Sequence, residues 1–417
     1  MRKIFILIMC CALFSSCIHE NNENSSLERT QKMQRNSVIP VFSKNTQPCH
    51  KMYKPINYDI QKAVWISYID LCPSLTGKSE SEFRYNFKKM CSNVSELGCN
   101  TIYLHLRPFG DAIYKSKLYP ASRYITGEAE KYADFDPLEI MLEIAHSYKL
   151  SVHGWINPLR CENKDTILNY RKDYLIKKWY EEKSEKICEV DGDSHLWLNP
   201  AYQEVRRLIA DGVKEIAENY EIDGIHYDDY FYPTTDKNFD EQCFAQQNES
   251  DLSKWRMNNI SLMVEQIYDS VKSVNPDILV GVSPQGNMEN NYQYMYADVK
   301  KWCSENGYID YIVPQIYFGY KNTVKPFEKT VEEWQKIVTN SNVKLIAGLG
   351  VYKISQNDDT EFSENNGIIA RQIRDSLYDF NCHGFALYNY VNLFEPSEEA
   401  AVRTNAEIDC IKKVLDD

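Results

Sequence analysis

The chain has 417 residues and a formal net charge of −13, with 43% hydrophobic and 26% charged residues. These proportions are typical of a soluble globular protein, and the acidic balance argues against a nucleic-acid-binding surface. The length accommodates one large domain or two of ordinary size.

The first residues have the pattern of a targeting segment. Arg2 and Lys3 precede an apolar run, Ile4–Phe14, that is too short to span a bilayer. Two serines then stand before Cys17, which resembles a bacterial lipoprotein signal. We expect residues 1–16 to be removed and Cys17 to carry a lipid that anchors the protein in the bacterial cell envelope, at the outer membrane. An ordinary cleaved signal peptide is the alternative.

The segment after Cys17 is polar and has no apolar period, which predicts a flexible tether over residues 17–59. Residues 60–417 are then expected to form a single catalytic domain. The cysteines are scattered without a CxxC pair, so the sequence indicates no zinc site and assigns no disulfide.

From residue 60 onward, strand-like apolar runs alternate with helical patterns. The expected strands are Ala63–Asp70, Thr101–Pro108, Ser151–Pro158, Gly224–Tyr230, Ile278–Gln285, Tyr311–Tyr317, Lys344–Tyr352 and Gly384–Tyr390. Between them, apolar residues recur at steps of three and four, as at Phe83, Phe87 and Met90. The alternation favours parallel pairing and predicts an α/β fold, a (β/α)8 TIM barrel. A doubly wound open sheet is the alternative, but no glycine-rich phosphate loop follows an early strand.

The stretch Asp223–Pro233, DGIHYDDYFYP, places two adjacent carboxylates at the end of the fourth expected strand, among aromatic residues. Burying such a pair costs free energy, which favours a functional role for it. The alternative is a structural role, as a helix cap or a salt-bridged turn. In a (β/α)8 barrel the active site forms where the strands end. Polar and aromatic residues gather at the other expected strand ends too.

Several phrases of the chain resemble, in order, the glycosyl hydrolase-like 10 family over about residues 60–400. These phrases are VWISYIDL, NTIYLHLRPFGDAIYKSKLYPASRYITG, WINP, WLNPAYQEVRRLI, DGIHYDDYFYP, GVSPQG and PQIYFGY. The resemblance implies a bacterial TIM-barrel lipoprotein that acts as a glycosidase on an oligosaccharide or polysaccharide. It fixes the fold and the class better than the substrate.

Glycoside hydrolysis uses two carboxyl groups, one as acid and one as base or nucleophile. Asp228 has the strand parity of His226, so its side chain is expected to rise into the barrel mouth. Asp229 points the other way on an ideal strand and joins Asp228 only if the chain bends there. We assign Asp228 and Asp229 as the catalytic pair, with Asp70 and Asp111 as other candidates for the second acid.

The phrase around Asp228 also resembles the family-18 chitinase pattern DGxDxDxE. His226 replaces an inner aspartate of that pattern, and Tyr230 stands in place of its catalytic glutamate. A chitinase mechanism is therefore not expected.

Other strand-end residues are assigned to substrate binding, namely Arg107, Asp111, Asn157, His226, Gln315, Tyr317 and Tyr388. Arg107 offers a fork of donors for an acidic sugar or a carboxylate, with an ion pair to Asp111 as its structural alternative. The two amides suit sugar hydroxyls, and the tyrosine rings suit either sugar faces or an ordinary core.

Two other classes of function compete with a glycosidase. His105, His153 and His226 on neighbouring strands, with Asp228, suit a metal-dependent hydrolase, but no HxH or HExxH occurs. A non-catalytic carbohydrate-binding lipoprotein is the third class, because a fold does not dictate function. We expect no metal, no cofactor and no nucleic-acid partner.

Overall fold

The computed structural model describes residues 53–356 and 359–416. Nine parallel strands form one sheet in the order β10-β9-β8-β7-β3-β2-β1-β12-β11. They are β1 (Gln61–Ile66), β2 (Thr101–Arg107), β3 (Ser151–Ile156), β7 (Gly224–Tyr227), β8 (Leu279–Val282), β9 (Tyr311–Ile312), β10 (Lys344–Leu345), β11 (Ala347–Gly350) and β12 (Gly384–Tyr388). Only Ile346 separates β10 from β11, so the two share one position and close the sheet between β9 and β12. The predicted (β/α)8 barrel is confirmed.

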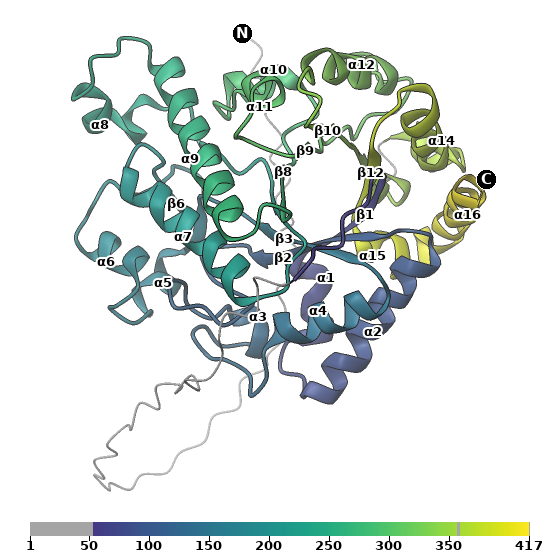
Figure 1. Cartoon of the computed structure of the whole chain (residues 1–417), viewed down its shortest axis with the longest axis horizontal. Helices are drawn as coiled ribbons and strands as arrows, with labels where there is room; N and C mark the ends of the chain where they lie inside the picture. Colours follow the sequence, from purple (N-terminus) through teal and green to yellow (C-terminus); the bar gives the residue numbers. More distant parts are fainter. Residues whose placement is uncertain (1–52, 357–358, 417) are drawn as a thin grey trace, which may run out of the picture. The chain divides into compact units, whose positions relative to one another are not determined.

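One principal helix follows each strand position, and Figure 1 shows these helices as an outer ring around the strands. They are α2 (Glu80–Glu96), α4 (Pro137–Ser147), α7 (Gln203–Asn219), α9 (Leu252–Val274), α11 (Val299–Ser304), α12 (Phe327–Ile337), α14 (Ile368–Arg374) and α16 (Glu398–Asp416). Asp136 caps α4, with Pro137 in its first turn. Among the described residues, no helix has the length and apolarity needed to cross a membrane.

Shorter helices and strands lie in the loops that follow the barrel strands. They are α1 (Tyr68–Leu75), α3 (Arg123–Thr126), β4 (Arg160–Asn163), α5 (Lys164–Leu168), α6 (Leu175–Glu181), β5 (Ile187–Glu189), β6 (His195–Leu198), α8 (Glu241–Ala245), α10 (Met288–Gln293), α13 (Thr360–Glu364) and α15 (Tyr390–Phe394). The excursion after β3 contains a separate antiparallel sheet in the order β4-β6-β5. This small sheet forms one side of the barrel mouth.

Aromatic and histidine side chains fill the barrel interior. Trp65 Nε1 donates to His226 Nε2 at 3.2 Å, and an indole N–H is a donor only. Neutral His226 therefore carries its proton on Nδ1 and donates it to the Tyr311 hydroxyl at 3.1 Å. The His226 ring also stacks on Tyr103, with centroids 4.1 Å apart. A Cβ added at Gly281 would lie 2.1 Å from the Tyr311 ring, so only glycine fits beneath it.

The segment just before β1 is held against the opposite end of the barrel from the strand-end loops. Asp223 Oδ1 accepts from the Tyr53 hydroxyl at 2.5 Å and from the Ile56 N–H at 2.6 Å. Its Oδ2 accepts from the Val152 N–H at 2.7 Å and lies 2.9 Å from His146 Nε2. Residues 53–59, which the sequence analysis placed in a flexible tether, are therefore tied to the barrel. Residues 1–52, including the expected signal and Cys17, lie outside the described residues.

The four contacts of Asp223 make a direct test of this anchoring. In Asp223→Asn, whichever way the amide turns, its NH2 faces a backbone N–H that needs an acceptor. We expect the free energy of unfolding to fall by about 3 kcal/mol, measured by urea denaturation. Asp277→Asn, at an exposed position, is the control. A loss within about 0.5 kcal/mol for Asp223→Asn would show that the anchoring is unimportant.

Candidate active site

Asp228 lies at the barrel mouth, directly after β7, and its side chain points inward. Trp155 Nε1 donates to its Oδ2 at 3.0 Å, and the Tyr230 N–H donates to its Oδ1 at 3.4 Å. Only 4% of the residue is exposed. Burial and the charge of Asp229 raise the pKa of Asp228 well above its usual value, outweighing the opposing effects of Arg160 and Trp155. The surroundings of Asp228 therefore favour its protonated form more than water does.

Asp229 lies beside Asp228 because β7 ends at Tyr227 and strand alternation no longer applies. Gln315 Nε2 donates to Asp229 Oδ1 at 3.2 Å and to the Ser283 carbonyl at 3.1 Å. Burial raises the pKa of Asp229, while the amides of Gln285 and Gln315 favour its charged form. The bend required by the sequence prediction is thus present. Burial raises the pKa of both acids, and only Asp229 is held by side-chain amide donors.

Three partly buried tyrosines form one side of the mouth. Tyr317 and Tyr388 stack with ring centroids 5.9 Å apart, and Tyr352 meets Tyr317 edge-on at 5.7 Å. Tyr388 also packs edge-on against Trp65 at 5.9 Å. The structure therefore brings Tyr317 and Tyr388, two of the residues assigned to substrate binding, together near Asp228, whose charge affects both hydroxyls.

The other side of the mouth contains a cation that sequence reasoning missed. The Arg160 guanidinium carbon lies 3.8 Å from the Tyr230 ring centroid and 4.6 Å from that of Phe109. The His195 ring stacks on Phe109 at 4.9 Å, and Trp197 packs against Tyr230. The only sequence signal for Arg160 is its place three residues after Asn157, at the end of the third strand.

His105 and Asn157 support the floor of the mouth. The His105 ring stacks on Trp155 with centroids 3.7 Å apart, and burial holds its pKa well below the usual value. Asn157 Nδ2 donates to the Pro108 carbonyl at 3.0 Å. Trp155 thus packs on His105 and orients Asp228.

Arg107 does not reach the mouth, so its assignment to substrate binding is wrong. Its guanidinium lies between the strands and the outer helices, 4.3 Å from the Tyr119 ring centroid. It is so close to α7 that a Cβ added to Gly212 would be 2.4 Å from Nη1. The cause is a register shift between His105 and Arg107, which reverses the alternation at the end of β2.

Two further assignments to substrate binding are corrected. His226 uses both ring nitrogens inside the barrel and is fully buried. Asp111 is only 1% exposed, and its Oδ1 accepts from the Phe109 N–H at 2.9 Å. Burial and the neighbouring Glu162 raise the pKa of Asp111 to about 6. Both side chains support the structure below the surface that a ligand meets.

Asp70, the other candidate for the second acid, has a structural role. It accepts from the Ser67 N–H at 2.7 Å, and from Asn389 Nδ2 and the Val391 N–H at 3.0 Å each. These bonds join the end of β1 to the end of β12. They leave Asp229 as the better placed partner of Asp228.

The histidines offer no ligand set for the metal-dependent alternative. His153 Nδ1 lies 2.6 Å from the Tyr311 hydroxyl, and its Nε2 lies 3.1 Å from Ser151 Oγ. Within residues 53–356 and 359–416, no three His, Cys, Asp or Glu side chains gather in a metal-binding group.

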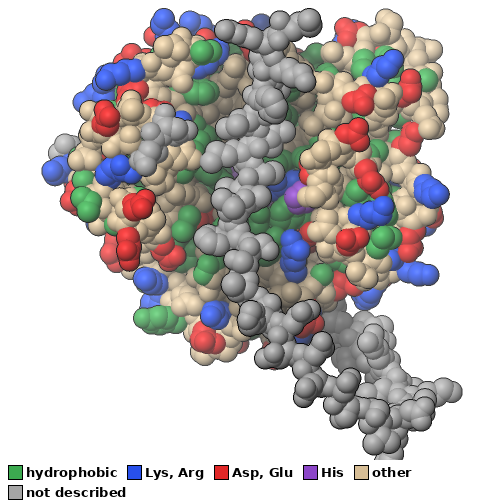
Figure 2. Space-filling model, turned by 180° about the vertical axis from the view of Figure 1, so that it is seen from behind, with side chains coloured by type: hydrophobic (Ala, Val, Ile, Leu, Met, Phe, Trp, Pro, Cys, Tyr) green, Lys and Arg blue, Asp and Glu red, His purple; other side chains and the backbone are tan. Residues whose placement is uncertain are grey.

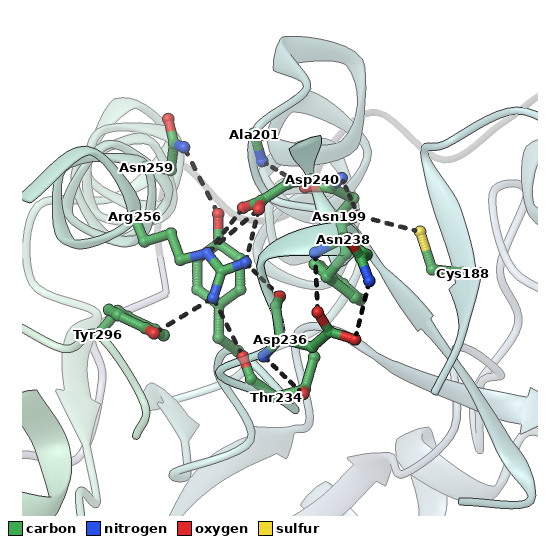
Figure 3. Close-up of polar contacts among 12 residues, drawn as sticks. Cys188, Asn199, Ala201, Thr234, Asp236, Asn238, Asp240, Arg256, Asn259 and Tyr296 are labelled. Carbon is green, nitrogen blue, oxygen red and sulfur yellow. Dashed lines mark hydrogen bonds and ion pairs between the residues drawn. The ribbon is translucent and has the colours of Figure 1, made fainter. Parts of the chain in front are cut away.

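A buried ion pair holds the long loop that follows Asp229. Arg256 of α9 donates from Nη2 to Asp240 Oδ1 at 2.6 Å and to the Asp236 carbonyl at 2.6 Å. Figure 3 shows the same guanidinium reaching Thr234 and Tyr296. Asp240 and Arg256 are both fully buried, so this pair fixes the loop and, through it, the exit of the chain from the carboxylates.

The family model described as glycosyl hydrolase-like 10 matches residues 61–364. The chain belongs to this family. Glycosyl hydrolase YngK of Bacillus subtilis (strain 168) is 32% identical over 330 residues, which cover 73% of this chain and 63% of that protein. Glycosyl hydrolase DigH of Escherichia coli (strain K12) is 30% identical over 288 residues, or 63% of this chain and 65% of that protein. The chain thus spans less than two thirds of the length of these family members.

Solved structures agree on the barrel. The glycoside hydrolase domain of PgaB (BpsB) from Bordetella bronchiseptica has a TM-score of 0.54 at 12% identity, covering 84% of this chain and 99% of that one. The catalytic domain of β-amylase from Paenibacillus polymyxa has a TM-score of 0.53 at 13% identity, covering 84% and 98%. At these identities the likeness concerns the fold.

The raised pKa of Asp228 predicts a specific dependence of stability on pH. Because the folded protein binds this proton more tightly than the unfolded chain, the free energy of unfolding falls as pH rises above the unfolded pKa of about 3.9. Asp228→Asn keeps an acceptor for Trp155 and removes this loss. We expect the variant to gain stability over wild type progressively from pH 4 to 7, measured by thermal melts. Asp165→Asn, at an exposed site, is the control. A constant difference across this range would contradict the buried proton.

Proposed function

We propose that the chain is a glycoside hydrolase that cleaves glycosidic bonds of an oligosaccharide or polysaccharide by carboxylate acid–base chemistry. The observation that carries the proposal is the unequal environment of Asp228 and Asp229. Neighbouring acids whose surroundings separate their protonation states suit the two roles that glycosidases need. Family membership supports the same class of reaction.

Asp228 is the proton donor in this proposal. Burial and the charge of Asp229 favour its protonated form, and Trp155 fixes its orientation. The proton passes to the glycosidic oxygen as the bond to the anomeric carbon breaks. The Asp229 carboxylate, held by Gln315, stabilises the positive charge that develops on the sugar ring. Water then bonds to the anomeric carbon and gives up a proton to the pair, which restores the protonated acid.

The aromatic sides of the mouth supply binding. The partly exposed rings of Tyr317 and Tyr388 suit stacking on sugar rings, and Phe109 with Tyr230 provides rings on the opposite side. Figure 2 shows hydrophobic side chains near the centre of one face, with charges of both signs farther out. Mixed surface charge of this kind does not favour nucleic acid.

Replacing the two carboxylates separately tests the chemistry. Asp228→Asn keeps the size of the side chain and removes the proton donor, so hydrolysis is expected to fall on the order of 10³-fold or more, with little change in glycan affinity. Asp229→Asn is expected to lower the rate as well, because a charge opposite the developing cation is lost. The measurement is hydrolysis of a polysaccharide panel, with binding by calorimetry.

Two results would reject the proposal in different ways. An Asp228→Asn protein within a few-fold of the wild-type rate would remove Asp228 from the chemistry. Tight binding of a glycan without any cleavage by the wild type would favour the non-catalytic carbohydrate-binding alternative.

We also propose that Cys17 carries a lipid and attaches the protein to a bacterial membrane in the cell envelope. The support is the signal-like sequence before Cys17. Cys17→Ser protein is expected to leave the membrane fraction, followed by sedimentation and immunoblotting. Unchanged sedimentation with membranes would contradict this anchoring.

A further inference from the structure

Arg160 is a fixed cation at the barrel mouth. It begins β4, on the small sheet, and its guanidinium lies against the rings of Tyr230 and Phe109, at 3.8 and 4.6 Å. Contact with aromatic faces holds a planar guanidinium in place. The Tyr230 hydroxyl also interacts with the Arg160 guanidinium.

The charge of Arg160 is not matched by an ion pair. No carboxylate in the part of the chain that the structure describes pairs with it, whereas nearby Arg123 pairs with Glu162 at 3.2 Å. The Nε of Arg160 is buried without a hydrogen-bond acceptor. A buried donor without an acceptor costs free energy of folding, so packing alone does not explain an arginine at this position.

Arg160 lies close enough to Asp228 and Asp229 to affect both carboxyl groups. Its charge lowers the pKa of Asp228 and of Asp229, and it also affects the Tyr68 hydroxyl. A ligand that reaches Asp228 between the aromatic sides therefore passes the guanidinium.

We propose that Arg160 binds a carboxylate on a sugar adjacent to the scissile bond, so that the enzyme acts on glycans that carry acidic residues. This inference rests on the proposed glycosidase function. The forked donors of arginine match a carboxylate with two parallel hydrogen bonds, and a neutral sugar leaves them unpaired. The net charge of −13 gives no general attraction for anionic polymers, so the recognition is local.

The test uses the full chain and matched pairs of substrates. Each uronic-acid-containing oligosaccharide is compared with its carboxyl-reduced, neutral form, by kcat/KM and by calorimetric Kd. Wild type is expected to prefer the carboxylate form by about 10- to 100-fold. Arg160→Gln abolishes the preference, mainly through KM, and Arg160→Lys restores part of it.

Arg371 provides a matched control. Its guanidinium also lies 3.8 Å from a tyrosine ring, that of Tyr320, but it is paired with Glu328 and Asp375 away from β7. Arg371→Gln is expected to keep the preference of the wild type.

The outcomes separate this inference from the proposed function. If Arg160→Gln only shifts the pH profile equally for both forms, Arg160 tunes the acids and binds no carboxylate. Equal wild-type affinity for both forms, including no binding of either, also overturns the inference. If nothing is cleaved but the carboxylate form binds more tightly in an Arg160-dependent way, the hydrolase proposal fails and carboxylate recognition stands.

Discussion

Asp228 is buried next to Asp229, and placing two carboxylates together in a buried site costs free energy. Much of the barrel mouth is arranged so that it offsets this cost. Two carboxylates side by side in a desolvated site cannot both ionise cheaply, so burial and mutual repulsion favour protonation of one of them. The Trp155 N–H orients the protonated group, and Gln315 holds the other. This division of roles follows from solvation and hydrogen bonding.

The rest of the fold supplies rigidity for this arrangement. Below Asp228, His226 is fixed between Trp65 and Tyr311, so the strand that leads to the acid cannot shift without breaking buried hydrogen bonds. Above it, the ion pair of Arg256 with Asp240 anchors the loop that continues from the acids. Removing one partner of such a buried pair is costly, and the loop position is correspondingly well defined.

The sequence was sufficient to predict the barrel, because each buried parallel strand appears as a short apolar run between helical patterns. Strand lengths were less predictable. The expected strand Tyr311–Tyr317 contains only Tyr311–Ile312, since Pro314 has no N–H for the ladder. Strand parity correctly aimed Asp228 into the mouth, but it failed for Arg107, because a register shift within β2 cannot be read from residue types.

Other features of the site depend on contacts between distant parts of the chain. Arg160 lies between Phe109 and Tyr230, which come from different strand-end loops, and no periodicity reveals that meeting. The same limit applies to His226, whose polar side chain suggested ligand binding, whereas its partners Trp65 and Tyr311 occupy other strands.

The most direct measurement of the central claim is a crystal structure of the Asp228→Asn protein with an uncleaved oligosaccharide. The account predicts a glycosidic oxygen within about 2.6–3.2 Å of the side chain of residue 228, with the Asp229 carboxylate facing the sugar ring at the cleaved bond. An oligosaccharide whose glycosidic oxygens all lie away from these two residues would contradict it.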